Sequence, residues 1–255
     1  MVERESRTVL AVGAHPDDVE ILCAGVLALL KEKGWNIEIA SMTPGDCGST
    51  TLSREEISKI RKSEATTSAE LIGANYTCME NDDVFIMYDR STLLKAINLI
   101  RKVKPNIVIT HSPQDYMVDH EITSQVIRTA CFSAGIKNIK TDSEPFMKIP
   151  HLYYMDAIEG KDTLGNAIKA TIIIDISSTI EIKERMLKAH KSQRSWLMTH
   201  NRVDEYIISM KNFSAKRGKE IGVHYAEGYR QHLGQAYPQS NILKEELVEY
   251  TKTLE

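Results

Sequence analysis

The stretch TVLAVGAHPDDVE, residues 8–20, carries most of what this sequence says about its fold. It begins as an apolar strand and runs directly into His15, Asp17 and Asp18. Open α/β sheets bind their ligands beyond the carboxyl ends of the strands, which is where these side chains would stand. Helix capping would explain one carboxylate, but not a histidine and two carboxylates together. We therefore interpret His15 and Asp18 as ligands of a divalent metal, with Asp17 free beside it.

A second segment, which ends in His120, is expected to supply the third ligand. Residues 105–110 form the continuous apolar run of a strand buried on both faces, and His120 follows just before an amphipathic helix. In the common doubly wound order the first and fourth strands are neighbours, so His120 would join His15 and Asp18. Three protein ligands and one open position make a catalytic zinc site. A structural histidine at a helix start is the alternative.

Composition excludes several classes of function. Of the 255 residues, 42% are hydrophobic and 26% charged, which is typical of a soluble globular protein. A net charge of -3 gives no general attraction to nucleic acid or anionic lipid. No apolar run approaches membrane-spanning length, and the first residues lack the apolar core of a signal peptide. The four cysteines are scattered, which favours free thiols in a reducing compartment. We expect a cytoplasmic protein with neither nucleic-acid nor membrane partners.

Alternating strand and helix signals in residues 1–135 predict an α/β fold with a mostly parallel sheet and flanking helices. Strands are expected at 8–14, 35–43, near Tyr76, at 105–110, at 152–158 and at 170–176. Helices are expected from the repeats that include Leu22–Leu30, at 53–71, around Leu93–Ile100, around Ile122–Ala130 and at 180–194. A polar, less periodic C-terminal third follows. The first strand lacks a Gly-x-Gly-x-x-Gly turn, which argues against nicotinamide binding.

Five blocks of the sequence together resemble the PIG-L/LmbE-like family of zinc-dependent N-deacetylases. The most similar branch is the one that deacetylates N-acetylglucosaminyl malate in bacillithiol synthesis. The blocks are GAHPDDVE at 13–20, IRKSEA at 60–65, DH at 119–120, AHKSQ at 189–193 and GVHYAEGY at 222–229. The resemblance spans nearly the whole chain. It implies one Rossmann-like domain over 1–255, in which 1–135 is the βα core with the metal site and 136–255 completes the substrate cleft.

The resemblance also assigns roles to residues. It implies that Zn²⁺, or another divalent metal, is held by the three ligands named above, and that Asp17 is the general base for the hydrolytic water. Arg61 and Asp119 are the expected substrate-binding residues, although a surface role for Arg61 is the equal alternative. Several relatives assemble as hexamers, so a homo-oligomer is expected.

One departure from the family pattern concerns Met117. The family usually has His-Pro-Asp-His where residues 117–120 are MVDH. The first histidine of that motif pairs with the aspartate and stabilises or protonates the tetrahedral intermediate. A thioether has no proton to give and no positive charge, so Met117 can do neither. We expect another histidine to replace it in space, and His111 and His224 are the catalytic candidates. The weaker candidates are His151, His200 and His232, while His190 is expected to be structural.

The expected function is therefore a zinc hydrolase that removes an acetyl group from an N-acetylated amino sugar or glycoside. Its products would be acetate and a free amine. Two alternatives stay open at this point. One is a metal-dependent amidase that acts on a different amide, with Met117 marking a reshaped site. The other is a metal-binding sensor or scaffold without turnover.

Overall fold

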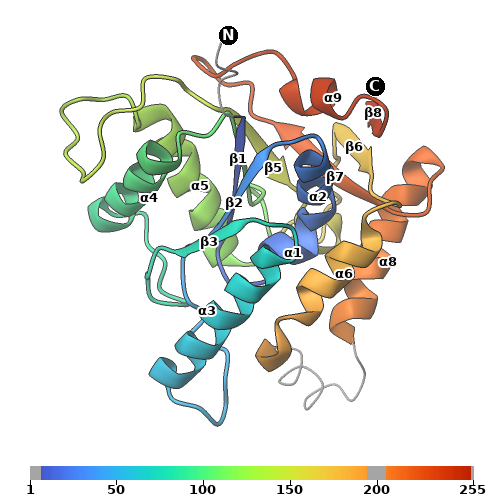
Figure 1. Ribbon diagram of the computed structural model, residues 1–255, viewed down its shortest axis with the longest axis horizontal. Helices are drawn as coiled ribbons and strands as arrows, with labels where there is room; N and C mark the ends of the chain where they lie inside the picture. Colours follow the sequence, from blue (N-terminus) through green and yellow to red (C-terminus); the bar gives the residue numbers. More distant parts are fainter. Residues whose placement is uncertain (1–6, 194–204, 254–255) are drawn as a thin grey trace.

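An eight-stranded mixed sheet forms the centre of the computed structural model, which describes residues 7–193 and 205–253. Across the sheet the strands are β3 (Asn75–Cys78), β2 (Asn36–Ser41), β1 (Thr8–Gly13), β4 (Ile107–Thr110), β5 (His151–Met155), β7 (Ala226–Gln231), β6 (Ile172–Asp175) and β8 (Thr251–Thr253). The first five of these are parallel, and β7 runs antiparallel to both of its neighbours. The α/β fold with a mostly parallel sheet is confirmed (Figure 1).

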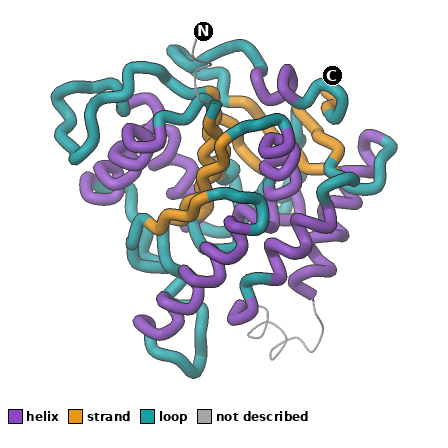
Figure 2. The backbone as a smooth tube through the Cα atoms, viewed as in Figure 1, coloured by secondary structure: helices purple, strands orange, loops and turns teal. Residues whose placement is uncertain are grey.

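Helices cover both faces of this sheet (Figure 2). In chain order they are α1 (Asp18–Leu22), α2 (Ala24–Glu32), α3 (Arg54–Glu70), α4 (Arg90–Val103), α5 (Val118–Ser133), α6 (Ile180–Lys188), α8 (Glu205–Ile221) and α9 (Ile242–Glu246). Side chains of β1 alternate between two cores, as the two-residue period of a strand requires. Val9 and Ala11 pack with residues of α2 and α6, whereas Leu10 and Val12 pack with residues of α4 and α5.

The N-terminal half follows the sequence expectations closely. Strand β1 lies beside β4, with Val9 next to Ile107, so the assumed strand order is confirmed. Ser53 caps α3 in a reciprocal arrangement: its hydroxyl accepts from the Glu56 amide, and the Glu56 carboxylate accepts from the Ser53 amide. The expected helix after His15 is divided into α1 and α2, because Cys23 has non-helical backbone angles. The division leaves α1 as a short separate helix that begins at Asp18.

The C-terminal half differs from expectation in two places. Helix α6 ends at Lys188, well before the expected boundary, and residue 194 lies outside the described residues. The stretch read as polar and less periodic contains the 17-residue helix α8 and the strand β7, which is inserted between β5 and β6. Buried polar residues such as Ser214 and Arg217 interrupt the apolar pattern of α8. Arg217 is buried because it pairs with Asp156, at 2.7 and 2.9 Å.

A buried ion pair ties α2 and α6 to β7. Lys183 Nζ lies 2.6 Å from Glu227 Oε1, and both side chains are almost fully buried. Glu227 also accepts from the backbone amides of Gly25 and Val26, both at 2.9 Å, at the start of α2. The negative charge at this helix N-terminus is favourable for the macrodipole.

We expect Lys183→Met to destabilise the protein by about 3 kcal/mol, because it leaves a buried carboxylate without its counter-charge. For a domain of this size the melting temperature should fall by about 6–12 °C in calorimetry. The control is Lys188→Met on the same helix. Lys188 forms its ion pair with Glu184 at the protein surface. That exposed pair should contribute less than about 1 kcal/mol. Equal melting temperatures for the two variants would contradict this prediction.

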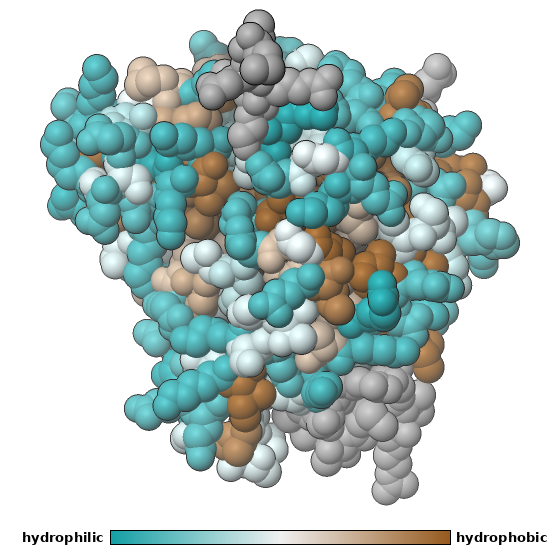
Figure 3. All heavy atoms as spheres, in the orientation of Figure 1, coloured by the Kyte–Doolittle hydropathy of each residue, from teal (hydrophilic) through white to brown (hydrophobic). Residues whose placement is uncertain are grey.

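The face of the molecule seen in Figure 3 is mainly polar. On the face seen in Figure 3, hydrophilic residues dominate and apolar residues gather in separate patches. Among the helices of the described ranges, none combines the length and the apolar character needed to cross a bilayer. The four cysteines, Cys23, Cys47, Cys78 and Cys131, are all free thiols, as expected.

Candidate metal centre and active site

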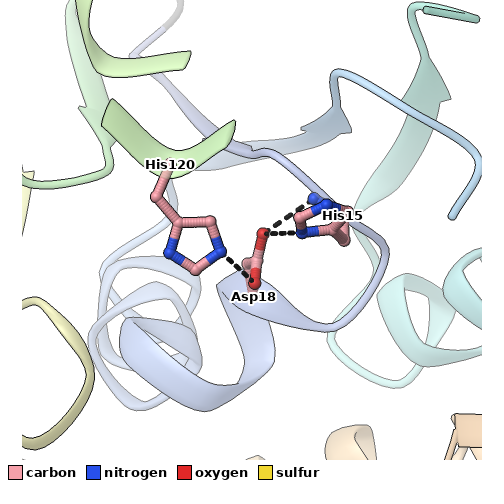
Figure 4. A group of neighbouring side chains, drawn as sticks. All are labelled: His15, Asp18 and His120. Atoms are coloured by element: carbon pink, nitrogen blue, oxygen red, sulfur yellow. Dashed lines mark hydrogen bonds and ion pairs between the residues drawn. The ribbon is translucent and has the colours of Figure 1, made fainter. Parts of the chain in front are cut away.

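His15, Asp18 and His120 converge at the carboxyl ends of β1 and β4 (Figure 4). His15 follows β1, Asp18 opens α1, and His120 lies in the first turn of α5. Asp18 stands between the two imidazoles: its Oδ2 is 3.4 Å from His15 Nδ1, and its Oδ1 is 3.4 Å from His120 Nε2. All three side chains are buried, and one ligand atom from each lies within 4.8 Å of the others. Two nitrogens and one carboxylate oxygen fit the donor set of a catalytic zinc site.

Each candidate ligand histidine has a carboxylate behind it. His15 Nε2 lies 3.1 Å from Asp83 Oδ1 and 3.3 Å from Asp119 Oδ2. His120 Nδ1 lies 3.0 Å from Asp115 Oδ1. Carboxylates that accept from the outer N–H of a ligating histidine fix the orientation of the ring and raise its basicity. The three side chains and the carboxylates around them could therefore hold and orient a divalent metal.

Asp119 lies behind His15 rather than on the cavity wall. It is 3% exposed, and besides His15 it accepts from the Val84 amide at 3.0 Å. In the family pattern this aspartate pairs with a histidine at position 117. Here that position is Met117, and Asp119 pairs with His15 instead. Its expected role in substrate binding has no support from this position. Asp119 is placed to orient a ligand.

His111 is brought to the centre, but on the side away from the cavity. It is fully buried, and its ring stacks on that of His120 with the centroids 3.8 Å apart. Its Nε2 lies 3.0 Å from Asp18 Oδ2 and 3.0 Å from the Ala14 amide nitrogen. Burial, with the neighbouring His120, lowers the pKa of His111. His111 can position two ligands, but a substrate in the cavity has no route to it, so it does not stand in for the missing catalytic histidine.

The other replacement candidates do not reach the centre within the described part of the chain. His224 is exposed in the segment before β7 and is absent from the cavity wall. His151 begins β5, at the amino end of that strand and so away from the site, and its Nε2 lies 3.0 Å from Ser240 Oγ. His232 pairs with the Tyr154 hydroxyl. His200 lies outside the described residues. The expectation that His224 supplies the imidazole therefore fails on position.

Asp17 is on the cavity wall in an unusual backbone conformation. Its φ of 115° is positive, a region that non-glycine residues adopt at a cost and that is often found at functional sites. The Tyr206 hydroxyl donates to Asp17 Oδ2, and Arg61 Nη2 lies 3.4 Å from Asp17 Oδ1. Burial raises the pKa of Asp17, while the charge of Arg61 opposes this. A carboxylate with a raised pKa is a better proton acceptor near neutral pH.

Arg61 is not a surface residue. It is 5% exposed and donates to the carbonyl oxygens of Pro16 and Gly45, at 2.9 and 3.0 Å. Gly45 has a φ of +68°, and a Cβ there would lie 2.2 Å from Arg61 Nη1, so the loop depends on this glycine. Arg61 Nε is buried without a partner among the described residues. Arg61 thus braces the loop around Asp17.

A cavity of about 480 Å³ opens over these groups, a volume ordinary for a small-molecule site. It is lined by His15, Asp17, Asp18, His120, Arg61, Asp83, Gly48, Cys47, Gln193 and Tyr206, and by the apolar or aromatic residues Ile21, Val84, Tyr116, Met117 and Ile158. Asp83, Asp115 and Tyr206 were not anticipated from the sequence. Asp83 lies in a polar loop and Tyr206 far along the chain, so neither carries a local signal.

Comparison with known proteins agrees with this geometry. Residues 10–131 match the family model described as PIG-L: GlcNAc-PI de-N-acetylase. This match covers slightly less than half of the chain and shows a similarity to the PIG-L family. The matched segment begins in β1 and ends in α5, so it contains all three candidate ligands.

Three curated relatives illustrate the range of activities in similar proteins. The diacetylchitobiose deacetylase of Thermococcus kodakarensis is 27% identical, over 88% of this chain and 82% of the relative. The 4-oxalmesaconate hydratase of Pseudomonas putida is 24% identical, over 87% and 88%. A probable N-acetyl-α-D-glucosaminyl L-malate deacetylase of Bacillus subtilis, from the branch suggested by the sequence motifs, is 24% identical, over 74% and 85%.

The fold is also found in solved structures. The N,N'-diacetylchitobiose deacetylase from Pyrococcus horikoshii superimposes with a TM-score of 0.77 at 22% identity, covering 93% of this chain and 89% of that one. At this identity the likeness shows that the two proteins share a fold.

Proposed function

We propose that this protein is a zinc-dependent hydrolase that removes the acetyl group from an N-acetylated amino sugar or glycoside. The observation that carries the proposal is the convergence of His15, Asp18 and His120 beside the free carboxylate of Asp17 in one cavity. The similarity to deacetylases of N-acetyl amino sugars supports the same reaction. Two imidazoles and one carboxylate are a donor set that catalytic zinc sites use.

The chemistry is divided between the metal and Asp17. A zinc ion at this centre would polarise the acetamide carbonyl and lower the pKa of a water molecule. Asp17 accepts a proton as the water oxygen bonds to the carbonyl carbon. When the C–N bond breaks, Asp17 returns the proton to the leaving nitrogen, because an amide anion is too poor a leaving group. Water and the acetamide thus become acetate and the free amine.

The C-terminal half of the chain supplies part of the same cavity. Ile158, Gln193 and Tyr206 line it together with residues from the N-terminal half. Gln193 belongs to the AHKSQ block, and Tyr206 contacts Asp17 directly. These contacts support the division in which 1–135 carries the metal and 136–255 completes the substrate cleft.

The function is tested by measuring acetate release from a panel of N-acetylglucosaminides with the zinc-loaded protein. Release of acetate and a primary amine in equal amounts, abolished by a chelator and restored by Zn²⁺, is the expected result. The panel should include N-acetylglucosaminyl malate and diacetylchitobiose. Absence of acetate from every sugar would contradict the proposal.

The similarity to a hydratase defines the main competing reaction, the addition of water to an activated C=C bond. 4-Oxalmesaconate is therefore tested as a further substrate, and its consumption is monitored by the loss of its absorbance. A panel of other acylated amines tests the alternative of a different amide substrate. Tight metal binding without any of these activities would favour a sensor or scaffold.

Exposed apolar side chains near the cavity support assembly into a homo-oligomer. Phe85, Met87 and Val118 are each more than 60% exposed, and Val84 at the cavity wall adjoins Phe85. Burial of such residues against another copy would be favourable. Light scattering tests this proposal, with a hexamer as the largest expected assembly.

Zinc uptake should depend on pH through His120. Burial lowers the pKa of His120, but the charges of Asp18 and Asp115 outweigh it and raise that pKa to about 9. Because metals bind the neutral imidazole, an ion that enters below pH 9 must displace this proton. Zinc affinity should therefore fall at least about tenfold per pH unit from pH 8 to pH 6. Competition with a chromophoric chelator, corrected for its own protonation, measures this; a constant affinity would contradict it.

A further inference from the structure

Among the described residues, the cavity wall has no histidine besides the candidate ligands His15 and His120 to stabilise the oxygen of the tetrahedral intermediate. Met117 lines the cavity where the family pattern has that histidine, and its thioether has no proton to donate. Neither His111 nor His224 faces the cavity. Hydrolysis of an amide places negative charge on the former carbonyl oxygen, and a positioned donor at that oxygen is among the largest contributions to catalysis. A donor must therefore be sought among the residues of the wall.

Most polar groups on the wall are already engaged. The Tyr206 hydroxyl donates to Asp17. Arg61 braces two carbonyl oxygens and lies on the Asp17 side. Gln193 is on that side as well, because both Gln193 and Arg61 lie beside Gly48. A Cβ built on Gly48 would be 3.2 Å from Gln193 Oε1 and 2.6 Å from Arg61 Nη1. These groups surround the base, and none of them faces the opposite side of the centre, near His120.

Tyr116 occupies that opposite side. It precedes Met117 in the segment between β4 and α5, and its side chain lines the cavity while remaining 56% exposed. Its ring meets the ring of His120 edge-on, with the centroids 5.4 Å apart and an angle of 86°. Its hydroxyl makes no hydrogen bond within the described ranges, so it is free to donate to a substrate.

A phenol has an ordinary pKa of about 10, so it keeps its proton at neutral pH and can donate a hydrogen bond without being consumed in the reaction.

We propose that the Tyr116 hydroxyl donates a hydrogen bond to the developing oxyanion and so performs the role that Met117 cannot. The proposal rests on the deacetylase function proposed above. As the water oxygen bonds to the carbonyl carbon, the π electrons move to the carbonyl oxygen, and the Tyr116 O–H donates to that oxygen while keeping its proton. When the C–N bond breaks, the C=O bond re-forms and the hydrogen bond weakens. The proton for the leaving amine comes from Asp17.

The test is Tyr116→Phe, which keeps the ring beside His120 and removes only the hydroxyl. We expect kcat for acetate release from the best N-acetylglucosaminide to fall about a hundredfold, because the lost bond forms in the transition state. KM should change less than about twofold, since the acetamide ground state does not need this donor. Zinc content should equal that of the wild type.

The matched control is Tyr88→Phe. Tyr88 is similarly exposed, but its hydroxyl pairs with Thr129 and it is absent from the cavity wall. It should keep the wild-type kcat. The rescue is the double variant Tyr116→Phe with Met117→His, which places an imidazole donor on the next residue of the wall. It should recover at least about tenfold of the lost kcat.

Two outcomes separate this proposal from the function on which it rests. If the wild type releases no acetate from any N-acetyl amino sugar, the proposed function itself is wrong. If the wild type is active and Tyr116→Phe keeps its kcat, the function stands and the role of Tyr116 is overturned. A fall confined to KM, or a parallel loss of zinc, would equally overturn it, since either would indicate binding or structural support.

Discussion

Replacing Asp17 with asparagine is expected to leave zinc in the protein and to lower deacetylation at least about 10²-fold, the lower end of typical general acid–base contributions. Asparagine has the size of aspartate and adopts positive φ values readily, so the backbone at φ 115° should be retained. The Tyr206 hydroxyl can still donate to the remaining carbonyl oxygen. What is lost is the capacity to accept a proton from water and to return it to the amine.

The informative contrast is with Asp18→Asn, one residue along the chain. Asp18 faces His15 and His120 rather than Arg61 and Tyr206, so its substitution should lower zinc content as well as activity. Metal analysis after dialysis and acetate release are measured for both variants. If both lose zinc to the same extent, the two carboxylates do not have the separate roles proposed for them.

The convergence of the three candidate ligands could be predicted because two local signals meet through one topological rule. His15 and Asp18 stand at the end of an unmistakable strand, and His120 opens a helix after another. Parallel order then places both strand ends side by side, as the neighbouring β1 and β4 show. No side-chain detail is needed for that inference, since backbone topology alone limits where the ligands stand.

The supporting carboxylates and the catalytic surroundings could not be predicted in this way. Asp83 reaches His15 from a loop of polar residues, and Tyr206 reaches Asp17 across 189 positions of the chain. Such contacts depend on how loops and helices pack. A single sequence has no periodicity that encodes them.

The replacement histidines illustrate the same limit. His111 was a reasonable candidate from its place after β4, and it does reach the centre. The direction of its side chain, which stacks on His120 and turns from the cavity, follows from packing in the core. A position at a strand end thus predicts proximity to the site, but not the face that a side chain presents to a substrate.

Removal of the candidate ligand His120 should have the second large effect, on zinc affinity and on acetate release. In His120→Ala the centre keeps only His15 and Asp18, and a site with two protein ligands lacks the three that catalytic zinc uses. Zinc affinity should fall at least about 10³-fold, beyond the 10- to 100-fold loss typical of outer-shell partners. Acetate release should fall below detection when free zinc is buffered at the level that saturates the wild type.

The control for His120→Ala is Asp115→Asn, which removes the charge that orients His120 without removing a ligand. It should weaken zinc binding by only about 10- to 100-fold, so zinc in excess should restore its activity. Stability must be checked in parallel, because the His120 ring stacks on His111, and near-ultraviolet circular dichroism reports whether the core is kept. Full zinc occupancy in a folded His120→Ala protein would show that His120 is not a ligand. The segment after β4 would then contribute no ligand to a metal held by His15 and Asp18.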